Sequence, residues 1–154
     1  MTTTTIGTGV SSYAVEGPYD TAWSGTAVSL APGHGGQTRY YTIGSALNAI
    51  HDGCTVDDIK IEFVASKGSA FGPVTAYATF AGITLSVPSV SASSTAYSAN
   101  GGAGTLPSVV RAGVMSSSCL SEETFYTMAV NMSLPTITVT YTDNGIPYMM
   151  QFSL

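Results

Sequence analysis

The most regular alternation of apolar and polar residues lies near the end of the chain, on both sides of Asn144-Gly145. Both central positions of a type I′ turn need positive φ angles, which Asn and Gly tolerate best, so this dipeptide predicts a two-residue β-hairpin over residues 136–154. The resulting register places the apolar residues of both arms on one face. These predicted core residues are Ile137, Val139, Tyr141, Tyr148, Met150 and Phe152. The opposite face carries threonines together with Met149 and Gln151.

Alternation predicts further strands before this hairpin. Every second residue from Ile59 to Ala65 is apolar, which is typical of a strand with one buried face. Residues 74–87 also alternate, but their apolar positions change from even to odd numbers at Ala81-Gly82, which predicts a bulge or bend there. Residues 89–104 are rich in Ser, Ala and Gly and suit a surface loop or an edge segment.

Two segments have helical spacing. One begins at Ser45, an N-cap residue, and stops at Gly53, with apolar residues three and four positions apart, which predicts a short helix. Residues 122–132 fit a helix with Ser121 as its N-cap, and they also fit a strand with Tyr126 and alternate later residues on one face. The β-branched and aromatic residues of this segment favour the strand.

Together these elements predict a mainly β fold. Turn signals recur at short intervals, and 154 residues are enough for one domain with a hydrophobic core. We predict an antiparallel β-sandwich or jelly-roll-like single domain with one short helix and a C-terminal β-hairpin. The Thr- and Gly-rich residues 1–12 are expected to form an extended N-terminal arm, and residues 13–154 the single β-rich domain.

Composition limits the classes of partner. Charged residues make up only 8% of the chain and hydrophobic residues 44%, which predicts a folded protein that is solvated mainly by hydroxyl and amide groups. The four basic residues are too few and too scattered to bind nucleic acid or an anionic membrane. Residues 1–9 lack the features of a secretory signal, and no apolar run approaches the roughly 20 residues of a membrane span. We therefore expect a soluble protein without an export address.

His51, Asp52 and Cys54 are the most compact group of chemically active side chains. A cysteine beside a histidine suggests a nucleophile or half of a metal site, but no further Cys or His motif completes four ligands. The end of the short helix accounts better for these residues, with Cys54 as a small buried hydrophobe. Cys54 and Cys119 form either one disulfide or, as the alternative, two free buried thiols.

Other candidate groups are incomplete. His34 lies between glycines, which suits either ligand binding or a flexible loop. Asp57 and Asp58, with Glu62 nearby, lack the oxygen spacing of a calcium loop and are expected to be solvated carboxylates. No phosphate-binding loop or Gly-x-Ser-x-Gly elbow is present in the sequence, and carboxylates paired from distant strands are left as an open option. We therefore predict no catalytic residue, no cofactor and no metal, and no enzyme.

Aromatic residues concentrate in the first third of the chain. Exposed Tyr and Trp on a β-surface stack on sugar rings or anchor a protein interface, whereas half-buried sheet aromatics are the alternative. The candidate interaction surface combines such aromatics with two residues from the polar face of the hairpin. Its members are Trp23, Tyr13, Tyr19, Tyr40, Met149 and Gln151.

Scarce charge, abundant Thr, Ser, Gly and Ala, β structure and an N-terminal arm together resemble bacteriophage virion proteins, such as capsid decoration proteins and tail-fibre tip domains. The resemblance is one of overall character without a diagnostic motif, so it assigns no functional residue. It implies a non-enzymatic structural protein of the virion that forms a homo-oligomer and contacts other virion proteins. The alternatives are a carbohydrate-binding module or lectin, with a cell-surface glycan as its partner, and a small hydrolase using dispersed carboxylates or His51 with Cys54.

Overall fold

Two antiparallel β-sheets make up the fold in a computed structural model, which describes residues 2–6, 10–16, 23–24, 26–30, 36–43, 45–68, 72–121 and 126–144. The strands of the larger sheet are β1 (Thr2–Ile6), β3 (Trp23–Ser24), β4 (Ala27–Leu30), β6 (Cys54–Ser66), β9 (Thr95–Gly101), β11 (Met128–Met132) and β12 (Thr136–Asp143). Those of the smaller sheet are β2 (Val10–Glu16), β5 (Gly36–Ile43), β7 (Val74–Phe80), β8 (Ile83–Val87) and β10 (Val114–Ser121).

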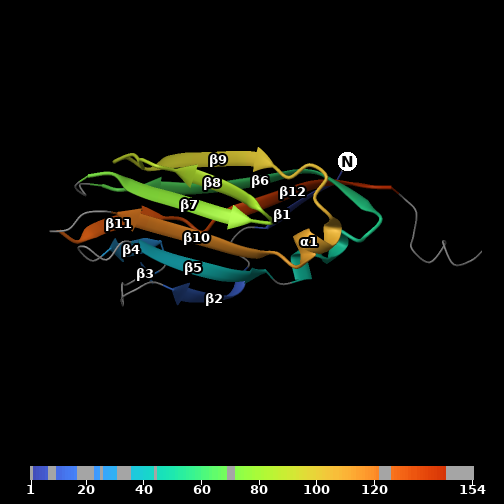
Figure 1. Ribbon diagram of the computed structural model, residues 1–154, viewed down its shortest axis with the longest axis horizontal. Helices are drawn as coiled ribbons and strands as arrows, with labels where there is room; N and C mark the ends of the chain where they lie inside the picture. The colour runs from blue at the N-terminus through green and yellow to red at the C-terminus, as the bar shows by residue number, and fades with distance from the viewer. Residues whose placement is uncertain are drawn as a thin grey trace, which may run out of the picture.

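The two sheets lie one in front of the other, as Figure 1 shows. The larger sheet has the strand order β1-β12-β6-β11-β4-β3, with β9 paired to β6, and the smaller has the order β2-β5-β10-β7-β8. Buried apolar side chains from both sheets form one core cluster between them. The predicted mainly β sandwich is therefore confirmed.

The alternation of β6 and β12 explains how the core is filled. Ile59 and Ile61 of β6 are fully buried, and Lys60 between them is partly exposed. On β12, Ile137, Val139 and Tyr141 are buried as predicted. Side chains alternate between the two faces of a strand, so these residues meet the core from the inner face.

β12 is the first arm of the predicted C-terminal hairpin, and the second arm lies outside the described residues. One edge of β12 pairs with β6 and the other with β1. In the pairing of β1 with β12, Thr2 is opposite Tyr141 and Ile6 is opposite Ile137. β1 therefore occupies the edge of β12 at which the second arm of a hairpin would pair. β1 pairs with β12, and β2 pairs with β5, and the sequence predicted neither pairing.

Residues Ala81 and Gly82 reverse the chain between β7 and β8. Both have positive φ angles, 50° and 82°, and Phe80 pairs with Ile83 across the turn. The predicted bend is therefore a two-residue hairpin turn, which explains why the buried positions change from even to odd numbers. Farther along the chain, β9 is an edge strand beside β6. β11 confirms a strand for Met128–Met132, whereas Tyr126 lies before it and residues 122–125 are outside the described residues.

Two short helices lie between strands. The predicted helix is a 3₁₀ helix, η1 (Ser45–Ala49), and it ends before Gly53 because the following turn is closed by a hydrogen bond from the Cys54 N–H to the His51 carbonyl. The second, α1 (Pro107–Arg111), lies at one end of the sandwich (Figure 1) and was not predicted. Within the described part of the chain, no helix has the length and apolar character needed to cross a membrane.

Candidate functional site

The three predicted interaction residues that the structure describes are divided between the two sheets. Tyr13 and Tyr40 lie on β2 and β5 of the smaller sheet, whereas Trp23 lies on β3 of the larger sheet. The side chain of Tyr40 is exposed, at 37%. Tyr19, Met149 and Gln151 lie outside the described residues.

Tyr40 belongs to a surface rich in hydroxyl groups on the outer face of the smaller sheet. Tyr40 is opposite Ser116 of β10, and the neighbouring row brings together Thr38, Ser118 and Tyr77 on three adjacent strands. The Thr38 and Ser118 hydroxyls are hydrogen-bonded at 2.7 Å. Neighbouring strands are about 4.8 Å apart, so β5 and β7, which carry the two tyrosines, are about 10 Å apart. The serines of β10 lie between them. We call this surface the Tyr40–Tyr77 face.

A second exposed feature surrounds α1. Pro107 and Val110 are buried and attach the helix to the sandwich. Leu106, Val109 and Val114 are exposed instead, at 65%, 46% and 54%. These three residues, which we call the α1 apolar patch, present apolar side chains to solvent within one short stretch of sequence.

The described residues contain one grouping of three potential metal ligands, formed by His51, Cys54 and Asp143. One ligand atom from each residue lies within 4.8 Å of the other two. His51 is in the turn between η1 and β6, and Cys54 is the first residue of β6. Asp143 ends β12, and the antiparallel register places it directly opposite Cys54.

A β-bulge sets this register. Thr140 pairs with Asp58, but Tyr141 pairs with Val56, so Asp57 is an extra residue on β6. The bulge keeps Cys54 and Val56 on the buried face although the later buried residues of β6 have odd numbers. The same irregularity explains why the sequence pattern showed the strand only from Ile59 onward.

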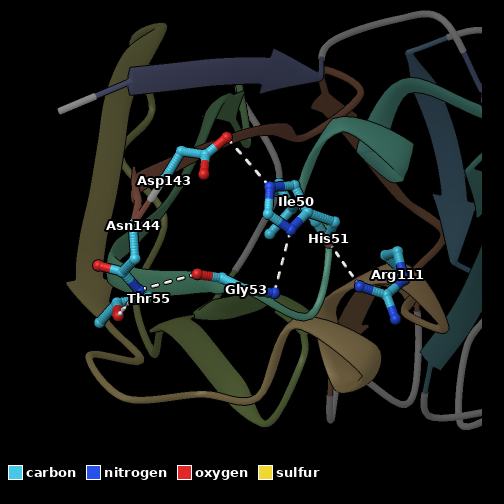
Figure 2. Close-up of polar contacts among 7 residues, drawn as sticks. All are labelled: Ile50, His51, Gly53, Thr55, Arg111, Asp143 and Asn144. Carbon is cyan, nitrogen blue, oxygen red and sulfur yellow. Dashed lines mark hydrogen bonds and ion pairs between the residues drawn. The ribbon is translucent and has the colours of Figure 1, made fainter. Parts of the chain in front are cut away.

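Two hydrogen bonds of the His51 ring, which Figure 2 shows as dashed lines, determine which ring nitrogen carries the proton of the neutral imidazole. The Gly53 N–H donates to Nδ1 at 3.0 Å, and a backbone N–H has no accepting role, so Nδ1 carries a lone pair. The proton of the neutral ring is therefore on Nε2, which donates to Oδ2 of Asp143 at 3.0 Å. This geometry selects one tautomer of the imidazole.

The turn that carries His51 is held from two sides (Figure 2). Arg111 of α1 donates from Nη1 to the Ile50 carbonyl at 2.6 Å, and its Nη2 pairs with the Asp52 carboxylate. On the other side, Asn144 donates from Nδ2 to the Gly53 carbonyl at 2.8 Å. The imidazole is therefore presented by a loop whose backbone is anchored to α1 and to the end of β12.

Cys54 is 6% exposed and free. Burial raises the pKa of its thiol, and the charge of Asp143 raises the pKa as well, while the backbone hydrogen bond at His51 acts in the opposite direction. A protonated thiol is a weak nucleophile. Because Nδ1 of His51 accepts from Gly53 and Nε2 donates to Asp143, the ring is not arranged as the base of a cysteine nucleophile.

The other candidates from the sequence are placed separately. Cys119 is also buried and free, so the two thiols are not bridged. Asp57 accepts a hydrogen bond from Thr142 at 2.6 Å, and Asp58 accepts one from Asn100 at 2.8 Å. Both carboxylates are partly buried rather than fully solvated. His34 lies outside the described residues.

The sequence pattern identified His51 and Cys54 but missed Asp143, which is 92 positions from His51. Asp143 appeared only as the last residue before the predicted Asn-Gly turn. The pairing of β12 with β6 brings it to the site, and neither strand contains a local signal for that pairing. The bulge at Asp57 makes the register still harder to derive from the sequence.

Comparisons with known proteins identify no family. No protein-family model matches the sequence, and no curated protein matches it either. Among solved structures, the chain is similar to a chain of the infectious bursal disease virus Gx strain, with 14% identity and a TM-score of 0.44 over 90% of this chain and 34% of that one. This chain therefore spans about a third of the length of that viral chain.

Two further structures are similar at the same low level. The CBM22-1 xylan-binding domain from Paenibacillus barcinonensis Xyn10C has 10% identity and a TM-score of 0.40, covering 88% of this chain and 85% of that one. The tobacco streak virus coat protein has 12% identity and a TM-score of 0.35, covering 89% and 90%. All three similarities have TM-scores below 0.5 and assign no function to this chain.

Proposed function

We propose that this chain is a non-enzymatic structural protein of a bacteriophage virion, as a capsid decoration protein or a tail-fibre tip domain. It acts through contacts with other copies of itself and with neighbouring virion proteins. The α1 apolar patch carries the proposal. Exposed apolar side chains that are close together mark interaction surfaces, and interface cores are depleted in charge and contain large apolar groups.

The surrounding composition supports the same role. Only 8% of the residues are charged, so few like charges oppose the close approach of two copies. Leu106 is the N-cap of α1 and Val109 lies within it, and the buried Pro107 and Val110 fix the helix to the sandwich. A rigid apolar surface binds with a small loss of conformational entropy.

The oligomeric state in solution tests this proposal. We expect the protein to self-associate as its concentration rises, measured by light scattering after size exclusion. The double variant Leu106→Asp with Val109→Asp should weaken this association at least tenfold. Ser108→Asp is the control for added charge, because it places one negative charge at an exposed position between the two substituted residues and removes no apolar group. A protein that stays monomeric at high concentration and binds no virion protein would contradict the proposal.

A second candidate function is glycan binding at the Tyr40–Tyr77 face. Tyrosine rings stack on the apolar faces of sugars, and the partly exposed Ser116 offers a hydroxyl between the two strands that carry them. Ser118 is buried, and its hydroxyl is hydrogen-bonded to that of Thr38. Under this function the virion protein recognises a host-surface glycan. A glycan array with the native protein, Tyr40→Ala and the exposed-tyrosine control Tyr126→Ala tests it. Specific binding lost only in Tyr40→Ala supports the function, and an array without a hit retires it.

A further inference from the structure

We propose that His51, Cys54 and Asp143 form a binding site for a single Zn²⁺ ion. The structure brings together an imidazole, a thiol and a carboxylate from two places far apart in the sequence, with ligand atoms within 4.8 Å of one another. The sequence alone offered half of a site, because His51 and Cys54 lacked a third ligand. The antiparallel pairing of Cys54 with Asp143 supplies it.

The geometry is close to that of a tetrahedral zinc site. Ligand atoms at 2.0–2.3 Å from Zn²⁺ are about 3.3–3.6 Å from each other. His51 Nε2 and Asp143 Oδ2 are now 3.0 Å apart, so they need to separate slightly to admit the ion. The Cys54 sulfur lies within 4.8 Å of the other two ligand atoms, so it needs to approach them by up to about 1.2–1.5 Å.

The chemistry of the ligands selects the metal. A thiolate excludes Mg²⁺ and Ca²⁺, which prefer oxygen ligands, whereas thiolate, imidazole and carboxylate are all zinc ligands. Three protein ligands leave the fourth tetrahedral position to water or to a partner's side chain. The site is accessible for this purpose, because the side chains of His51 and Asp143 are 43% and 49% exposed above the buried Cys54.

Binding exchanges hydrogen bonds for metal bonds. Zn²⁺ displaces the Cys54 thiol proton, which passes to solvent, and binds the resulting thiolate. At His51 the ion takes the Nε2 lone pair, so the neutral ring carries its proton on Nδ1 and gives up the hydrogen bond from the Gly53 N–H. The Nδ1–H would then face the Gly53 N–H at the present 3.0 Å, so the imidazole must turn away from Gly53. The loss of this hydrogen bond is small beside the formation of three metal–ligand bonds.

The surrounding contacts suit a metal site. Arg111 and Asn144 hold the backbone of the turn on both sides of His51, which limits the entropy lost when the ion binds. A bound ion would join the turn after η1 to the end of β12. The site is independent of the α1 apolar patch and the Tyr40–Tyr77 face, so its test is separate from that of the proposed function.

Metal titration of the full chain tests the proposal. Purified, metal-free protein is titrated with Zn²⁺ by calorimetry and with Co²⁺ by absorption, because a cobalt–thiolate bond gives a charge-transfer band in the near ultraviolet. We expect one ion per chain, a cobalt–thiolate band, and a higher thermal unfolding midpoint with Zn²⁺. Cys54→Ser should remove the band, and Asp143→Asn and His51→Ala should each weaken binding at least about tenfold.

Cys119→Ala is the matched control, because Cys119 is the other buried free thiol and belongs to no such grouping among the described residues. It should leave the cobalt–thiolate band and the stoichiometry unchanged. Asp143→Asn keeps an oxygen that accepts from His51 and changes an exposed position, so it is expected to fold. Absence of one-to-one binding, a cobalt spectrum without a thiolate band, or equal binding by Asp143→Asn and the native protein would overturn the proposal.

Discussion

The two buried thiols show how the position of a residue in the sandwich determines its chemistry. Cys119 of β10 is fully buried, and its sulfur lies 3.5 Å from that of Met132. Burial raises the pKa of its thiol from 9.0 to about 12. In the unfolded chain the same thiol ionises near pH 9, so the unfolded state loses its proton at a lower pH than the folded state.

This difference predicts how stability changes in alkaline solution. The contribution of Cys119 is full below pH 9 and falls as the pH rises toward 12, by about 1.4 kcal/mol per pH unit. Between pH 8 and 11, the free energy of unfolding in urea should fall by about 3 kcal/mol more for the native protein than for Cys119→Ala. Tyr41, whose pKa is also raised by burial, is common to both proteins. If the free energy of unfolding changed in parallel with pH in both proteins, the loss could not be assigned to Cys119.

Gly113 offers a second prediction at the residue scale, this time from packing. A Cβ atom there would lie 2.5 Å from Cε1 of Phe80 and 3.0 Å from the Val110 carbonyl oxygen. Neither the buried ring nor the backbone has space to move, so Gly113→Ala should lower the free energy of unfolding by about 1–3 kcal/mol. Gly101→Ala is the control, since its nearest contact is an ordinary 3.8 Å. Equal urea midpoints for the two variants would refute the packing explanation.

At the scale of elements, the turn between β7 and β8 combines good pairing with a strained residue. The Thr79 and Thr84 hydroxyls are hydrogen-bonded across it at 3.1 Å, yet Ala81 has a φ of 50°. Asn tolerates this conformation better than Ala, so Ala81→Asn should stabilise the protein by about 0.5–1 kcal/mol. Ala81→Val should have the opposite effect, because a β-branched side chain is disfavoured at positive φ. Urea unfolding of both variants measures the sign of each change in the free energy of unfolding. Changes in the same direction would refute the explanation from backbone strain.

The elements that the sequence predicted share a local signal. Alternation identified β12, the later part of β6 and the turn at Ala81-Gly82, because each depends on neighbours along the chain. The first residues of β6 were missed, since the bulge at Asp57 interrupts the alternation. Helix α1 has five residues and no side-chain hydrogen bond at its N-cap, so it left no start signal except Pro107.

At the scale of the whole molecule, the proposed binding sites depend on contacts that no local pattern contains. Pairing of β12 with β6 places Asp143 opposite Cys54, and pairing of β5, β10 and β7 places Tyr40 and Tyr77 on either side of the β10 serines. The sequence supplied Tyr40, His51 and Cys54 as single candidates. Their partners depend on strand order and register, and the same alternation of apolar and polar residues is compatible with several orders and registers.

The edge of β12 provides the last prediction. Deleting residues 1–6 removes β1 and leaves the main-chain groups that faced it without their present partners. We expect faster amide exchange along that edge of β12, measured by hydrogen–deuterium exchange, with β7 of the other sheet unchanged as the internal reference. An open edge also favours pairing with a second copy, so self-association should rise. If β12 keeps its full protection, another segment occupies the edge, and the second arm of the predicted Asn-Gly hairpin is the segment whose pattern fits it.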